Sequence, residues 1–292
     1  MAVFTKKTTI VHHMTYMAIM AAINLVFIIF ATFLPISILI LIIILPLVST
    51  VVAYFCQKKY YIIYAIATIG LCLIFNVVDT IFYIVPAVIT GFFIGVMLEY
   101  KINPFWMILV STAIQTGLTY LFIPLINVIS GTDFVLSILT FLKLETFVYR
   151  GAVTHLFIFF ISFTQTILTT LVLLNEIGKI GIKTEQQVAS VIPYISGLLF
   201  SLILAIVFAL FRSDYTFVFI AISFYFASFL LMDLFSSKKP MVYGLLVTTT
   251  IVSFFVFVFL YGMIVPPFGF VLFGLFSFSI GLISFLNKYL LK

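Results

Sequence analysis

The sequence predicts an all-α, polytopic helical membrane protein with about ten transmembrane helices. Of the 292 residues, 65% are hydrophobic and only 8% are charged, whereas soluble domains are about half apolar and about a quarter charged. At about 20 residues for each membrane-spanning helix, the roughly 190 apolar residues suffice for nine to ten spans. Hydrophobic runs also alternate regularly with short polar or proline-bearing breaks. These observations argue against soluble enzymes, nucleic-acid-binding proteins and disordered chains.

The predicted spans follow the hydrophobic runs in chain order. The first six cover residues 15–34, 37–55, 60–76, 81–98, 104–128 and 151–174, and four more cover 189–211, 215–234, 241–262 and 268–287. The residue before a proline disfavours helical geometry, so prolines often mark helix ends. Those that fit the ends of predicted spans are Pro35, Pro104, Pro240, Pro266 and Pro267. Prolines inside spans, which predict kinks, are Pro46, Pro86, Pro124 and Pro193. An apolar stretch at 134–144 predicts a short helix lying in the outer interface of the membrane.

The longest predicted cytoplasmic break divides the chain into two parts. Residues 176–188 form this linker, after a six-helix bundle at 1–175 and before a four-helix membrane extension at 189–292. With the ten spans in place, eleven lysines fall on one side and only Lys143, Arg150 and Arg212 on the other. Basic residues concentrate on the cytoplasmic side of membrane proteins. We therefore expect a multi-pass protein of the cell membrane with both termini in the cytoplasm.

Two stripes of polar residues lie on consecutive predicted helices. Ser111, Gln115 and Thr119 recur every four residues in the fifth span, and the sixth span carries a similar stripe of His155, Ser162, Thr166 and Thr169. Such spacings place each set on one helix face. The stripes either line a ligand cavity that opens outward or bond helix to helix. Both interpretations remain open from the sequence.

Stronger polar groups cluster at the predicted outer end of these spans. The candidate solute-binding residues are Asn76, Asp79, Gln115, Tyr120, Arg150, His155 and Gln165. No catalytic residue, metal ligand or cofactor is predicted, because the three histidines are poorly placed to serve a nucleophile and Cys56 and Cys72 lack a metal-binding spacing. No charged residue falls near the middle of a predicted span, which argues against self-powered ion coupling.

Two motifs of small residues permit close helix approach. Ala18 and Ala22 form A-x-x-x-A in the first span, and Gly91 and Gly95 form G-x-x-x-G in the fourth. For the glycines, packing within the bundle is the favoured interpretation. For the alanines, internal packing and docking to a separate membrane partner both remain open.

Three segments resemble a known family. They are Met14–Asn24, which holds the alanine motif, Leu45-Pro-Leu-Val-Ser49, and Val85–Gly95 followed by Glu99 and Lys101. The N-terminal six spans resemble the substrate-binding S component of an energy-coupling-factor (ECF) transporter. The four further helices are similar to those of the longer YybS-like membrane proteins of unknown function.

The resemblance implies a bundle that captures a small solute, vitamin-like or metal-like, from outside the cell. It also implies that Ala18 and Ala22 contact the T component, which transmits ATP hydrolysis by two ATPase subunits. The leading hypothesis is therefore a non-enzymatic, substrate-binding membrane subunit of an ATP-driven uptake system. The alternative is a non-transporting membrane scaffold or regulatory partner, in which the polar stripes only join helices.

Overall fold

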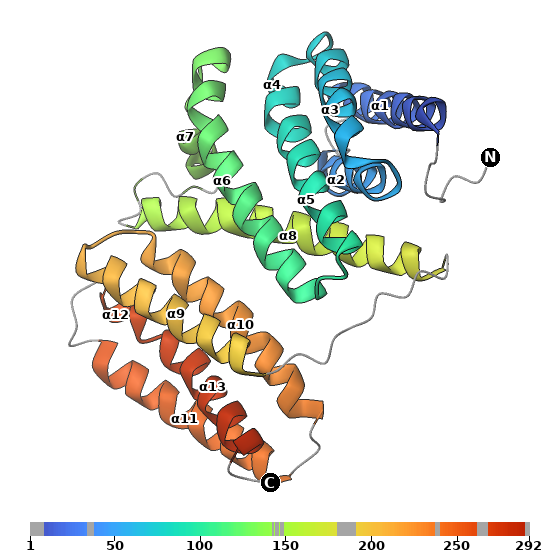
Figure 1. Ribbon diagram of the computed structural model, residues 1–292. Coiled ribbons are helices and arrows are strands. Elements are labelled where there is room, and N and C mark those ends of the chain that lie inside the picture. The colour runs from blue at the N-terminus through green and yellow to red at the C-terminus, as the bar shows by residue number, and fades with distance from the viewer. Residues whose placement is uncertain are drawn as a thin grey trace. The chain divides into compact units, whose positions relative to one another are not determined.

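The protein is all-helical throughout the residues that the computed structural model describes (Figure 1). These are residues 9–33, 38–141, 143, 146, 149–179, 191–236, 240–261 and 268–289. No strand occurs among them, so the predicted all-α class is confirmed. Pro35, Pro266, Pro267 and most of the predicted linker at 176–188 lie outside the described residues.

Each of the ten predicted spans contains a helix. The helical elements of the first part of the chain, including α4 and α7 between predicted spans, are α1 (Ile10–Phe33), α2 (Ile38–Phe55), α3 (Lys58–Leu73), α4 (Val77–Asp79), the π-helical turn η2 (Thr80–Ile84), α5 (Val85–Glu99), α6 (Pro104–Ser130), α7 (Phe134–Phe141) and α8 (Arg150–Lys179). The remaining ones are α9 (Val191–Leu210), α10 (Thr216–Ser236), α11 (Pro240–Tyr261), α12 (Phe268–Val271) and α13 (Gly274–Tyr289).

Within the described part of the chain, six stretches are long and apolar enough to cross a membrane. They are Ile10–Phe30, Val77–Glu99, Pro104–Ser130, Arg150–Glu176, Val191–Leu210 and Thr216–Leu234. Large apolar side chains also lie exposed along the helices, for example Ile66 (68%), Phe200 (63%) and Phe255 (66%). Exposed apolar surface on this scale needs a lipid environment rather than water. The multi-pass membrane character is thus supported, while the count of ten spans stays a prediction.

The prolines behave differently according to their position in a helix. Pro104 and Pro240 begin α6 and α11, as the sequence predicts. Pro193 lies in the first turn of α9, where its missing N–H costs no helical hydrogen bond, so it gives no reason for a kink. Ahead of Pro86, the N–H of Val85 donates to the carbonyl of Thr80 five residues earlier. This π-helical turn lets the helix pass from α4 into α5 without a break.

The chain divides into two compact units. As far as its residues are described, the first unit comprises 1–138 and 158–187, and the second comprises 139–157 and 188–292. Residues 139–157, which the sequence pattern places in the N-terminal bundle, therefore group with the C-terminal helices. The boundary between the units falls inside α8.

In the first unit, α2 packs closely along α5 (Figure 1). A Cβ added at Gly91 would lie 2.6 Å from Cβ of Ser49 and 2.8 Å from the carbonyl oxygen of Pro46. One added at Gly95 would lie 2.5 Å from Cβ of Ala53. Only glycine permits this approach of two backbones. The interpretation of G-x-x-x-G as internal packing is confirmed.

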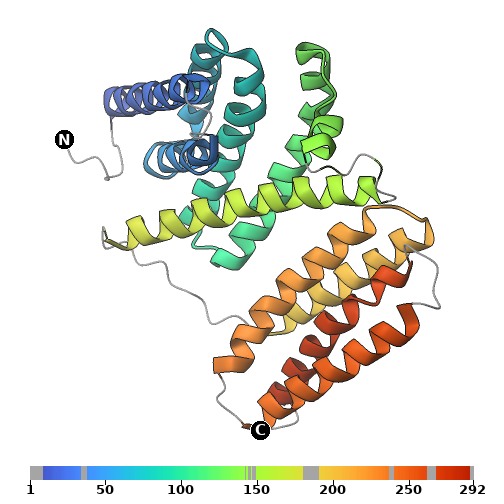
Figure 2. The same cartoon turned by 180° about the vertical axis from the view of Figure 1, so that it is seen from behind.

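In the second unit, α9, α10, α11 and α13 lie alongside one another (Figures 1 and 2). Serine hydroxyls join these helices: Ser223 of α10 and Ser277 of α13 are 2.9 Å apart, and both are buried. Gly197 of α9 lies directly against the ring of Phe226 of α10. Small residues and paired hydroxyls thus hold this unit together, as is usual for helices packed in lipid.

Candidate functional site

Three polar side chains meet in the core of the first unit, each from a different helix. Asn24 of α1 donates through Nδ2 to the hydroxyl of Tyr64 of α3 at 2.8 Å. The same hydroxyl lies 3.1 Å from Oγ of Ser49 of α2. Asn24 and Ser49 are 0% exposed and Tyr64 is 1% exposed. We call Asn24, Ser49 and Tyr64 the buried polar cluster.

The buried polar cluster is not fully satisfied. Oδ1 of Asn24 has no hydrogen-bond partner among the described residues, and the same holds for Oγ of Ser111 and Oγ1 of Thr170 in the same unit. All three residues are 0% exposed. Buried polar atoms are nearly always hydrogen-bonded, and polar groups at membrane depth usually face a cavity, a partner helix or a ligand. These atoms are therefore candidates for solute contact.

The polar cluster was not among the candidate residues drawn from the sequence. Asn24 and Ser49 end two of the segments that carry the family resemblance, but no pattern along the chain links either of them to Tyr64. The available signal was a single amide, Asn24, inside an otherwise apolar run of about 20 residues. Tyr64 carried no such signal, because tyrosines are frequent in this sequence.

Each of the two predicted polar stripes has one buried member that bonds to another helix, Gln115 in the first and Thr166 in the second. Thr90 of α5 donates to Oε1 of Gln115 at 2.6 Å. The hydroxyls of Thr112 of α6 and Thr166 of α8 are 2.6 Å apart. Gln165 is also buried, and Tyr120 is half-buried. For Gln115 and Thr166, these bonds favour the helix-joining interpretation of the stripes.

Asn76 and Asp79 are brought together at the start of α4. Oδ1 of Asn76 accepts from the backbone N–H of Asp79 at 3.0 Å, and its Nδ2 donates to Oδ2 of Asp79 at 2.7 Å. This is a reciprocal arrangement of an N-cap residue and a residue three positions later, similar to a capping box. Both side chains thus begin a helix, and Asp79 keeps a second carboxylate oxygen for further contacts.

Arg150 and His155 belong to the second unit, whereas the other five candidate solute-binding residues belong to the first. The ring of His155 stacks on Tyr215 with centroids 4.2 Å apart. The carboxylate of Asp214 contacts Gly151 in the first turn of α8, where the helix dipole favours negative charge. His155 and Asp214 therefore help to join the start of α8 to the turn between α9 and α10.

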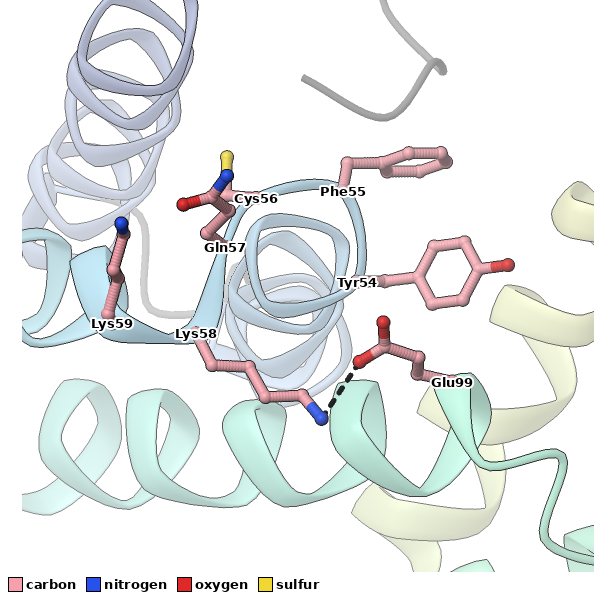
Figure 3. Close-up of a pocket in the computed structure, with 7 residues that line it drawn as sticks. All are labelled: Tyr54, Phe55, Cys56, Gln57, Lys58, Lys59 and Glu99. Carbon is pink, nitrogen blue, oxygen red and sulfur yellow. Dashed lines mark ion pairs between the residues drawn. The ribbon is translucent and has the colours of Figure 1, made fainter. Parts of the chain in front are cut away.

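A pocket of 420 Å³ lies where α2 ends, α3 begins and α5 ends (Figure 3). It is lined by Tyr54, Phe55, Cys56, Gln57, Lys58, Lys59 and Glu99. Nζ of Lys58 lies 2.9 Å from Oε2 of Glu99 and 4.4 Å from the ring centre of Tyr100. The hydrogen bond to Glu99 raises the pKa of Lys58, so this ammonium stays charged at physiological pH.

Comparison with protein-family models, with curated proteins and with solved structures finds no match for this chain. The described residues also bring together no group of three His, Cys, Asp or Glu side chains that could hold a metal ion. The candidate site therefore rests on the geometry of the buried polar cluster, with the residues around it in the first unit.

Proposed function

We propose that this chain is the solute-binding integral membrane subunit of an ATP-driven, ECF-type uptake system, and that it holds a small polar solute, such as a vitamin, in its first unit. The observation that carries the proposal is the buried polar cluster, with the unpartnered Oδ1 of Asn24 at its centre. An amide buried in an apolar bundle costs free energy unless it is bonded. A polar solute that bonds this oxygen removes that cost.

The placement of charge supports an external energy source. Charged side chains stand near the ends of the candidate spans: Asp79 and Glu99 in one, Arg150 and Glu176 in another, and Asp233 in a third. Carriers that couple transport to protons or sodium commonly place a carboxylate near the bilayer midplane. A solute-binding subunit that draws its energy from partner ATPases has no need of one.

The exposed face of α1 supports docking of a partner. Ala18 and Ala22 are both exposed on this helix, whereas Ala21 beside them is buried. Small residues on an exposed helix face allow another transmembrane helix to approach closely. In this proposal, Ala18 and Ala22 contact the T component of the transporter.

Solute binding is tested on the full-length protein purified from its membrane. We expect mass spectrometry of the released small molecules to find one compound bound to the wild type. Asn24→Leu should lower its occupancy about tenfold or more, since one lost hydrogen bond to a buried polar group costs about 1–3 kcal/mol. Asn287→Leu is the matched control, because Asn287 of α13 also has an unpartnered Oδ1 but lies in the second unit. Equal occupancy in both variants, or an empty wild type, would contradict the assignment.

A second function is favoured by a specific observation. The Thr90–Gln115 and Thr112–Thr166 bonds join helices, which suits a non-transporting membrane scaffold or regulatory partner. Co-purification separates the two functions, because a transport subunit should recover a T component and two ATPase subunits. Recovery of a different membrane enzyme would favour the scaffold.

The docking face is tested in the same co-purification. We expect Ala18→Leu combined with Ala22→Leu to abolish capture of the T component, because two added isobutyl groups hold the partner helix away. Ala113→Leu provides the control, since Ala113 is an exposed alanine on α6. Unchanged capture by the double variant would rule out this face of α1 as the docking surface.

A further inference from the structure

The pocket between α2, α3 and α5 keeps a positive charge that its own carboxylate does not cancel. Two lysines and one glutamate line it. Figure 3 shows Lys58 directed toward Glu99, while Lys59 points away from that pair. Nζ of Lys59 lies 4.8 Å from the ring centre of Tyr60, and the residue is exposed. The pocket therefore suits an anionic group, with Lys59 as its principal charged contact.

An exposed apolar surface continues from Lys59 along α3. We call Ile62, Ile63 and Ile66, which are 64%, 46% and 68% exposed, the isoleucine stripe. They follow Lys59 by three, four and seven residues, so all four side chains lie on one face of the helix. Seven residues of helix extend about 10 Å. The face is thus about two turns long, with a cation at one end and beyond it an apolar surface of about one turn, from Ile62 to Ile66.

This pairing is complementary to an amphipathic anion. A free phosphate would contact the pocket but leave the isoleucine stripe unused, whereas a phospholipid has both a phosphate and an acyl chain. Basic pockets beside membrane-spanning helices bind anionic lipid headgroups. We propose that the pocket binds the phosphate of an anionic phospholipid, with Lys59 contacting the phosphate and one acyl chain lying along the isoleucine stripe. This site does not depend on the proposed solute-binding function.

The test uses the delipidated full-length chain in detergent and counts bound lipid by native mass spectrometry. The wild type should bind dioleoylphosphatidylglycerol more tightly than dioleoylphosphatidylcholine. Lys59→Gln should weaken phosphatidylglycerol binding about fivefold, the effect of one basic residue near a membrane surface. Glu99→Gln should strengthen it by a similar factor, because Lys58 is then released. Lys288→Gln, a lysine in the last turn of α13, should leave it unchanged.

Two results would overturn the proposal. Equal binding of the two lipids, or equal effects of Lys59→Gln and Lys288→Gln, would show that no headgroup site exists here. Misfolding cannot imitate the expected pattern, because Lys59→Gln and Glu99→Gln shift binding in opposite directions.

A further comparison distinguishes a phospholipid from free inorganic phosphate as the ligand. Ile62→Ser combined with Ile66→Ser should weaken phosphatidylglycerol binding, and inorganic phosphate should not displace the lipid from the wild type. If inorganic phosphate displaces it and the isoleucine variant binds lipid normally, the ligand is a free phosphate and the lipid assignment is wrong.

Discussion

Alanine at both Gly91 and Gly95 is expected to separate α2 from α5 and to destabilise the first unit by about 3 kcal/mol, because overpacking a tight contact costs about 1–3 kcal/mol for each site. The added methyl groups would meet rigid atoms rather than flexible side-chain ends. At Gly91 these include the backbone nitrogen of Thr50 at 2.9 Å, and at Gly95 the carbonyl oxygen of Thr50 at 2.9 Å. Neither helix can accept them without moving.

The measurement is thermal or denaturant unfolding of the purified protein in detergent. Gly70→Ala on α3 is the matched control, since a Cβ at Gly70 would meet no atom of another helix within 4 Å. This change should be neutral or stabilise by up to about 1 kcal/mol, because alanine is the better helix former. A double variant as stable as the Gly70→Ala protein would show that α2 and α5 do not pack through these glycines.

Much of the fold could be predicted from the sequence, because helices in a membrane are encoded locally by runs of apolar residues. The predicted 104–128 span corresponds to α6 (Pro104–Ser130), whose proline sits where a helix can begin. The predicted 81–98 span begins four residues after the observed helix start at Val77. Asn76 caps that start through a short-range hydrogen bond, which hydropathy alone does not register.

The candidate site could be predicted only in part. Periodicity correctly placed Ser111 and Gln115 on a buried face of α6. Their partners could not be inferred: Gln115 bonds to Thr90 of α5, and the residue that bonds to α8 is Thr112, which the stripe did not include. A pattern along one helix shows which face is polar, whereas contacts between helices depend on their packing, which a single sequence does not record.

The same limit applies to Arg150 and His155. Both were grouped with Asn76 and Asp79 because the predicted topology puts all four residues at the outer side of the membrane. In the structure they are in a different compact unit from Asn76 and Asp79, and His155 pairs with Tyr215 of the second unit. Residues that the predicted topology puts on the same side of the membrane therefore do not all belong to one compact unit.

Removal of one hydroxyl from the buried polar cluster is expected to have the next largest effect. Tyr64→Phe leaves Nδ2 of Asn24 and Oγ of Ser49 without their shared partner. A buried polar group deprived of its bond costs about 1–3 kcal/mol, and bonds between membrane helices average about 0.6 kcal/mol with a maximum near 1.7. We therefore expect a loss of about 1–2 kcal/mol in the free energy of unfolding.

Tyr61→Phe provides the matched comparison for this prediction. Tyr61 is buried on the same helix, with its ring centre 5.3 Å from that of Tyr64, but its hydroxyl donates to a backbone carbonyl, that of Val88, at 2.7 Å. The Val88 carbonyl lies inside α5 and retains its place in the helical ladder, and Nδ2 of Asn24 keeps its bond to Tyr64, so the change should cost less than about 1 kcal/mol. If Tyr61→Phe destabilised the protein as much as Tyr64→Phe, burial of a phenol would explain both losses. A larger loss at Tyr64, accompanied by reduced solute occupancy, would instead identify the hydroxyl that positions Asn24 for binding.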